Sequence, residues 1–150
     1  MKILLPIDES ASSDAAILEV EDRYQTSGPT VRVLHVVPKF VPPAAALLDA
    51  GGSLEEARAQ VLARFQKTVE GVKERLTAPG LSVESTVLDG DPGRVIVKEA
   101  EDWGADLIVM GSHRYGPLKR MMMGSVANYV MDHAPCSVEI AHRRDQPGNE

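Results

Sequence analysis

The chain has a single cysteine, Cys136, among its 150 residues. One thiol cannot close a disulfide within the chain, and it cannot build a Cys-x-x-Cys redox or zinc motif. Large aromatic side chains are also scarce, with two Phe, three Tyr and one Trp. The sequence therefore offers few of the platforms on which single-stranded nucleic acids stack their bases. We expect a core of aliphatic side chains instead.

Long apolar runs are absent as well. No stretch approaches the roughly 18 consecutive apolar residues that a membrane helix needs. The opening segment, residues 1–10, has too short an apolar run to be the core of a signal peptide. Acidic residues outnumber basic ones by 22 to 16, for a net charge of -6. We therefore expect a cytoplasmic protein with no nucleic acid and no membrane as its partner.

A chain of 150 residues is close to the commonest size of a single domain. Short apolar segments that favour strands alternate along it with longer segments of helical periodicity. Proline and glycine pairs, or a serine or aspartate cap, separate most of them. The segments that favour strands are 2–7, 31–37, 81–87, 107–110 and 136–141, and helices are expected over about 10–27, 53–77, 91–103 and 125–133.

Strands that alternate with helices predict a parallel sheet with right-handed crossovers. Segments 3–7 and 107–110 are nearly continuous apolar runs, typical of central strands that are covered on both faces. Segments 81–87 and 136–141 alternate apolar with polar residues, which is typical of edge strands. The predicted fold class is therefore α/β and Rossmann-like: an open five-stranded parallel sheet of order 3-2-1-4-5 with helices on both faces.

In such a sheet, ligands bind beyond the carboxyl ends of the strands at the switch point between strands 1 and 4. The loops at this point begin at Asp8 and at Gly111. Gly111-Ser112 and Gly124-Ser125 bracket a loop that carries three cationic side chains, and the second pair opens a helix. Glycine lets backbone amides approach an anion, and a helix N-terminus attracts one. The pattern predicts a phosphate site, although it also suits ordinary turn and cap chemistry. Neither a P-loop nor a dinucleotide fingerprint occurs.

Several segments together resemble the universal stress protein family, whose members are small domains of the adenine nucleotide alpha hydrolase-like type. The resemblance covers residues 1–142, which we take as the domain, and 143–150 are expected to form a flexible tail. The segments that carry it are Pro6-Ile7-Asp8, Leu34-His35-Val36-Val37, Gly90-Asp91-Pro92, Met110-Gly111-Ser112-His113, 118–126 and Ala134-Pro135-Cys136-Ser137-Val138.

ATP-binding members of this family carry the pattern G-x2-G-x9-G-[ST]. Gly111 fits its first position, and Gly124 and Ser125 fit its last two. Arg114 stands where the middle glycine belongs. Arg114 either blocks the approach of the backbone to the phosphates or grips them with its guanidinium group, which suits phosphate geometry. The resemblance implies ATP as the ligand and is compatible with Mg²⁺ bridging its phosphates, but the sequence shows no carboxylate cluster dedicated to that ion.

The resemblance also implies roles for individual residues. Asp8 would reach the ribose or the adenine edge, and Val37 would hold adenine through its backbone. Met110 and Gly111 would line the wall beside the ribose and phosphates, and the helix that follows Gly124 would offer its amides. The full set of expected nucleotide-binding residues is Pro6, Ile7, Asp8, Val37, Met110, Gly111, Ser112, Arg114, Gly124, Ser125 and Val126.

Two functions are favoured at this stage; a third, an enzyme of the wider adenine-binding α/β group, has only the expected nucleotide cradle in its favour. The first is a regulatory protein that binds ATP and hydrolyses it slowly or not at all, because no catalytic residue is evident. The alternative is a dimeric interaction module without a nucleotide, in which Arg114 marks a lost phosphate loop. The resemblance further implies a homodimer paired through the strand Cys136–Ala141. We expect His35 and His133 to be structural or exposed residues.

Overall fold

The computed structural model describes residues 1–39, 53–77, 80–112 and 124–142. Strands and helices alternate along these residues, as the sequence predicts. The elements are β1 (Lys2–Ile7), α1 (Ala11–Tyr24), β2 (Thr30–Val37), α3 (Leu54–Thr77), β3 (Ser82–Asp89), α4 (Pro92–Trp103), β4 (Leu107–Gly111), α5 (Ser125–His133) and β5 (Ser137–Ala141). The expected tail, 143–150, lies outside the described residues.

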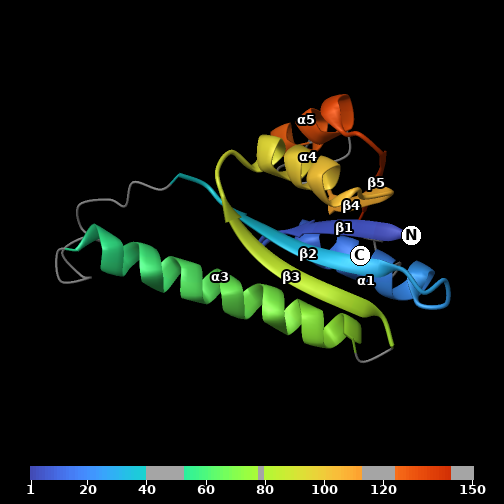
Figure 1. Ribbon diagram of the computed structural model, residues 1–150, viewed down its shortest axis with the longest axis horizontal. Coiled ribbons are helices and arrows are strands. Elements are labelled where there is room, and N and C mark those ends of the chain that lie inside the picture. Colours follow the sequence, from blue (N-terminus) through green and yellow to red (C-terminus); the bar gives the residue numbers. More distant parts are fainter. Residues whose placement is uncertain (40–52, 78–79, 113–123, 143–150) are drawn as a thin grey trace, which may run out of the picture.

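The strands form one parallel sheet in the order β3-β2-β1-β4-β5, which confirms the predicted fold class. Helices α4 and α5 cover one face of the sheet, and α1 and α3 cover the other (Figure 1). Strand β1 lies between β2 and β4, and Ile3, Leu4 and Leu5 within it are fully buried. None of the helices in the described ranges is long and apolar enough to cross a membrane.

Local signals set the helix ends. The Ser53 hydroxyl accepts a 3.3 Å hydrogen bond from the Glu56 amide at the start of α3. The Asp91 carboxylate accepts a 3.2 Å bond from the Arg94 amide at the start of α4. Gly104 ends α4 in the left-handed region, with a φ of 73°, where glycine has no Cβ to clash. The Asp91 cap thus starts α4 directly after the carboxyl end of β3, and Gly104 ends α4 shortly before β4 begins.

Candidate functional site

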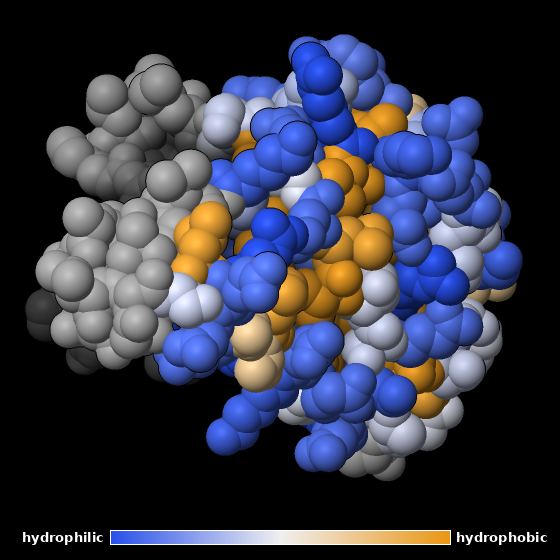
Figure 2. All heavy atoms as spheres, turned by 60° about the vertical axis from the view of Figure 1, so that its left-hand side comes forward, coloured by the Kyte–Doolittle hydropathy of each residue, from blue (hydrophilic) through white to orange (hydrophobic). Residues whose placement is uncertain are grey.

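A cavity of about 220 Å³ lies beyond the carboxyl ends of β1, β2 and β4. This is the predicted switch point, because β1 pairs with β2 on one side and with β4 on the other. Six of the expected nucleotide-binding residues line it, namely Pro6, Ile7, Asp8, Met110, Gly111 and Val126. Figure 2, turned toward the side on which these strands end, shows apolar side chains reaching the surface in a band between hydrophilic ones.

Seven further residues line the cavity that sequence reasoning did not assign to it. They come from β2, α1 and α4 and the turns beside them: Ser13, Leu34, His35, Val36, Pro38, Pro92 and Ile96. Most are apolar, so the walls on the α4 side suit a flat, uncharged group better than a phosphate. The period of two in β2 predicts that Leu34 and Val36 share a face, but only the crossing of α4 shows that this face borders the cavity.

Asp8 is held in a fixed turn at the start of α1. Its amide donates a 2.7 Å hydrogen bond to the Ser13 hydroxyl, and that hydroxyl donates a 2.9 Å bond back to Asp8 Oδ1. The Ser10 amide donates a third bond, of 2.8 Å, to the same oxygen. Ser13 is thus a partner that orients the Asp8 carboxylate at the cavity wall. The N-cap of α1 is Ser10, three residues before Ser13.

Gly111 is required by a close approach of two backbones. A Cβ atom at this position would lie 2.2 Å from the carbonyl oxygen of Ser12 in the first turn of α1. No side chain fits in that space. The end of β4 therefore packs directly against α1, which brings the loops that follow β1 and β4 together at the switch point.

The start of α5 lies next to the end of β4. The Gly124 amide donates a 2.8 Å hydrogen bond to the Ser112 carbonyl, which joins the residue before α5 to the residue after β4. Ser125 opens α5, and Val126 in its first turn borders the cavity. The first amides of a helix have no partner within the helix and favour an anion beyond its end. Arg114 lies outside the described residues.

Val37 is buried at the end of β2, and its carbonyl accepts a 2.9 Å hydrogen bond from the Gly90 amide. Its neighbours Val36 and Pro38 line the cavity, while Val37 itself does not. A carbonyl oxygen has a second lone pair, so this contact leaves room for another donor. The expected backbone contact between Val37 and adenine stays a prediction.

His35 lines the cavity and is only 4% exposed. Its ring stacks on that of Phe65 from α3, with centroids 3.9 Å apart. Neither ring nitrogen has a hydrogen-bond partner among the described residues. Burial lowers the pKa of His35, while the backbone of Val36 and the charges of Asp8 and Glu9 act in the opposite direction. The imidazole is therefore neutral near pH 7 and carries one donor and one acceptor.

No group of three or more His, Cys, Asp or Glu side chains that could hold a metal ion occurs among the described residues. This part of the chain thus supplies no carboxylate cage of its own for Mg²⁺. A magnesium ion that accompanies nucleotides is usually held by one or two carboxylates and by the phosphates themselves. Among the described residues that line the cavity, Asp8 is the one carboxylate.

An apolar cavity at the switch point of a parallel sheet, with a helix N-terminus at one end, is typical of α/β domains that bind nucleotides. The model of the universal stress protein family matches residues 1–142. Universal stress protein MJ0577 of Methanocaldococcus jannaschii is 30% identical over 155 aligned residues, which cover 96% of both chains. The chain belongs to the universal stress protein family.

Solved structures share the fold. MJ0577 superposes with a TM-score of 0.79 at 28% identity and covers 97% of both chains. The universal stress protein UspA of Lactobacillus plantarum superposes with a TM-score of 0.76 at 26% identity, covering 95% of this chain and 97% of its own. Two more distant structures of the same fold hold nucleotides. A universal stress protein in complex with cAMP is 20% identical, and an Arabidopsis thaliana family member with AMP bound is 17% identical.

Proposed function

We propose that this chain is a regulatory universal stress protein that binds ATP at the cavity between the ends of β1, β2 and β4. The observation that carries the proposal is that an apolar pocket adjoins a helix N-terminus that favours negative charge. An apolar hollow lined by β2 and α4 meets the end of β4 and the first turn of α5. A nucleotide has the same two parts, an uncharged base and a chain of phosphates.

The apolar part of the cavity suits adenine. Leu34 and Val36 from β2, Ile96 from α4 and Met110 from β4 all line it. Pockets that hold drug-sized ligands usually exceed about 300 Å³. The 220 Å³ of this cavity therefore corresponds to a base and part of a ribose, and the phosphates would extend beyond it.

The phosphates would extend along the start of α5. Its first-turn amides and the Ser125 hydroxyl provide hydrogen-bond donors, and the helix dipole favours negative charge at this end. We infer that Arg114 grips the phosphates, because a guanidinium group matches their geometry and the same loop already carries Lys119 and Arg120. In this proposal the Gly-Ser pair at 124–125 binds the phosphates, and Asp8 reaches the ribose or the adenine edge.

We expect slow hydrolysis or none. Oδ1 of the Asp8 carboxylate already accepts hydrogen bonds from the Ser10 amide and the Ser13 hydroxyl, which makes it a poor general base. No other carboxylate among the described residues lines the cavity. In the proposal, bound ATP is a regulatory ligand of a cytoplasmic protein.

We further propose that the protein is a homodimer formed through β5. This strand ends the sheet, and an unpaired edge invites pairing with another chain. The pairing would place the two β5 strands antiparallel across a two-fold axis, so that each residue acts twice in the interface.

Titration calorimetry of the purified chain with ATP, ADP, AMP, cAMP and GTP tests the nucleotide proposal. We expect saturable binding of ATP and weaker binding of GTP. Mass spectrometry of the protein as purified should detect an adenine nucleotide carried through purification. A homodimer that binds none of these ligands would favour the alternative, an interaction module whose phosphate loop has been lost.

A further inference from the structure

His35 is a buried polar side chain whose hydrogen-bonding capacity the described residues leave unused. Both ring nitrogens are inaccessible and have no partner among them. The Val36 backbone lies near enough to influence the ring, but no hydrogen bond of acceptable geometry joins the two. Buried polar groups in native proteins are nearly always satisfied, so an exception calls for a functional explanation.

Packing alone does not account for a histidine here. The ring stacks on Phe65, and the residues opposite His35 on the neighbouring strands are Ile7 and Val87. An apolar ring in these surroundings would leave no polar atom unsatisfied. The polar atoms of the imidazole therefore cost stability in the ligand-free fold.

A ligand in the cavity can supply the missing hydrogen-bond partner, because His35 forms part of the cavity wall. A half-turn of the imidazole about χ2 exchanges each nitrogen with a carbon and leaves the outline of the ring unchanged. The ring can thus turn a nitrogen toward a ligand while it keeps its stack on Phe65. A neutral imidazole matches either a donor or an acceptor on that ligand.

We infer that His35 binds the adenosine part of the nucleotide through a ring-nitrogen hydrogen bond, an inference that rests on the proposed function. His35 lies on β2, whereas the start of α5 follows β4, two strands away across the sheet. Strands are spaced about 4.8 Å apart, so His35 and the expected phosphates are separated by about 10 Å. The contact falls on the base or the ribose, and His35 becomes a specificity-determining residue for the nucleoside.

The test compares the wild type with His35→Phe, which keeps an aromatic ring to stack on Phe65 and removes both nitrogens. Calorimetry with ATP and with AMP should show an affinity loss of about three- to tenfold, equal for the two ligands. Without ligand, the variant should unfold at the same temperature as the wild type or higher. A residue with a merely structural role would lower that temperature. Phe65→Leu is the matched control, because it alters the stack and keeps the nitrogens; its ATP affinity should change less than twofold.

Nitrogen-15 NMR of the histidine rings provides an independent readout in the wild-type protein. The His35 signals, identified by their loss in His35→Phe, should shift when ATP saturates the protein. Unchanged signals, or unchanged affinity in a folded His35→Phe variant, would overturn the inference and leave the proposed function standing. An affinity loss for ATP that is absent for AMP would also overturn it, by moving the contact to the phosphates. A wild type that binds no adenine nucleotide overturns both the proposed function and the His35 contact. Titration of the wild type with ATP, done before any variant is measured, identifies this outcome.

Discussion

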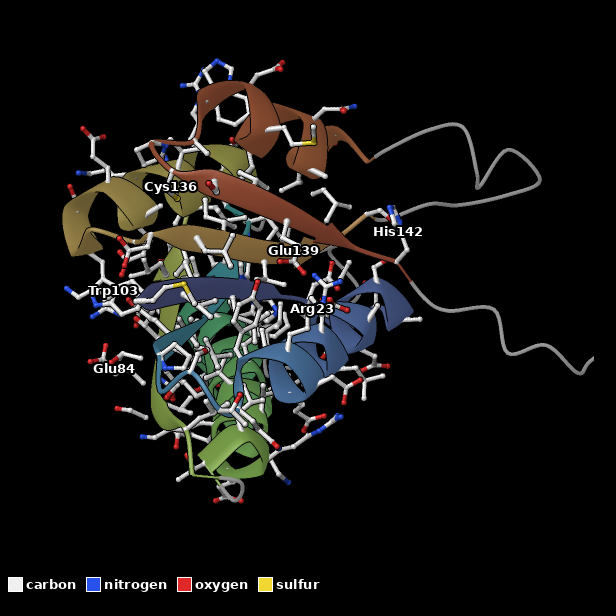
Figure 3. The ribbon with its side chains drawn as sticks, turned by 90° about the vertical axis from the view of Figure 1, so that its right-hand side faces the viewer. Arg23, Glu84, Trp103, Cys136, Glu139 and His142 are labelled. Atoms are coloured by element: carbon white, nitrogen blue, oxygen red, sulfur yellow. The ribbon has the colours of Figure 1, made fainter. Side chains whose placement is uncertain are left out.

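The Tyr24 hydroxyl on α1 donates a 2.7 Å hydrogen bond to the carboxylate of Glu139 on β5. This bond raises the pKa of Tyr24, with burial and the charge of Glu139 acting in the same direction. Arg23 points toward the same carboxylate, 3.6 Å away (Figure 3). The one charged side chain of β5 is thus turned onto α1. It does not extend outward to guard the edge against pairing, as charged residues on many edge strands do.

A substitution in β5 tests the dimer that this open edge suggests. We expect the wild type to have a mass of about 32 kDa in solution, twice that of one chain. Val138→Pro removes a backbone donor and distorts the strand in both copies, so it should shift the protein toward monomers. Val138→Thr keeps the amide and the β-branched shape and should stay dimeric. Light scattering at micromolar concentration measures both. A monomeric wild type, or a fully dimeric proline variant, would place the subunit contact elsewhere.

A charge at the start of α5 tests the position of the phosphates. Gly124→Asp should abolish ATP binding, because two like charges 4 Å apart near a protein surface repel by about 4 kcal/mol. The fold should survive, since the backbone of Gly124 has an ordinary φ of -64° and aspartate is a favourable N-cap. Gly124→Asn is the matched control, as it has the same shape without the charge. Equal ATP affinities of the two folded variants would show that the phosphates lie elsewhere.

Substitutions of Arg114, which stands where the family pattern has glycine, test whether its side chain grips the phosphates or obstructs them. If the guanidinium grips the phosphates, Arg114→Gly weakens ATP binding by about 1.5–3 kcal/mol, the usual contribution of a charge-assisted hydrogen bond. Arg114→Lys should lose less, because the positive charge remains. Calorimetry on the three proteins gives the answer. Tighter binding by the glycine variant would mean that the wild-type side chain obstructs the site.

The fold could be predicted because its signals are local. The apolar run in β1 and the one in β4 place these strands in the centre, and the alternation in β3 and β5 places those at the edges. The order in the sheet follows, and with it the position of the switch point. Caps such as Asp91 and Gly104 are also encoded within a few residues of where they act.

The remaining parts of the site depend on contacts between distant segments. The packing of His35 depends on Phe65, thirty positions further along the chain, whose ring covers one face of the imidazole. Of the two roles that the sequence predicts for His35, structural or exposed, the exposed one is wrong, because the side chain is buried; that it lies in the cavity wall could not be read from the sequence. The contact between Ser13 and Asp8 could not be predicted either, although the two residues are close in the sequence. Three nearby serines could each cap α1, and only the folded turn shows that Ser13 binds Asp8.

The close approach at Gly111 predicts a cost in stability that is independent of any ligand. Gly111→Ala should destabilise the protein by about 3 kcal/mol or more, because the added methyl would overlap the Ser12 carbonyl. Gly71→Ala is the matched control. It lies within α3 with open space around it, so it should stabilise the protein by about 0.5–1 kcal/mol. Urea unfolding of both variants measures the difference. A Gly111→Ala variant as stable as the wild type would contradict the backbone contact.

Acidification should destabilise the protein through His35. Burial lowers the pKa of this histidine in the folded state, whereas an unfolded histidine titrates near 6.5. The charged groups that face it are Asp8 and Glu9, which oppose the shift, and Glu9 is itself paired with Arg64 of α3. Because the unfolded chain binds the proton more readily, this stability is complete above about pH 6.5 and is lost as the pH falls below it.

His35→Phe removes this titration and isolates its contribution from that of all other groups. Between about pH 7.5 and 5.5, the free energy of unfolding should fall less in the variant than in the wild type, by up to about 1.4 kcal/mol for each pH unit below 6.5. Urea unfolding of both proteins at the two pH values, without nucleotide, measures the difference. Equal losses in the two proteins would mean that the imidazole finds a partner in the folded state and binds its proton as readily there as in the unfolded chain.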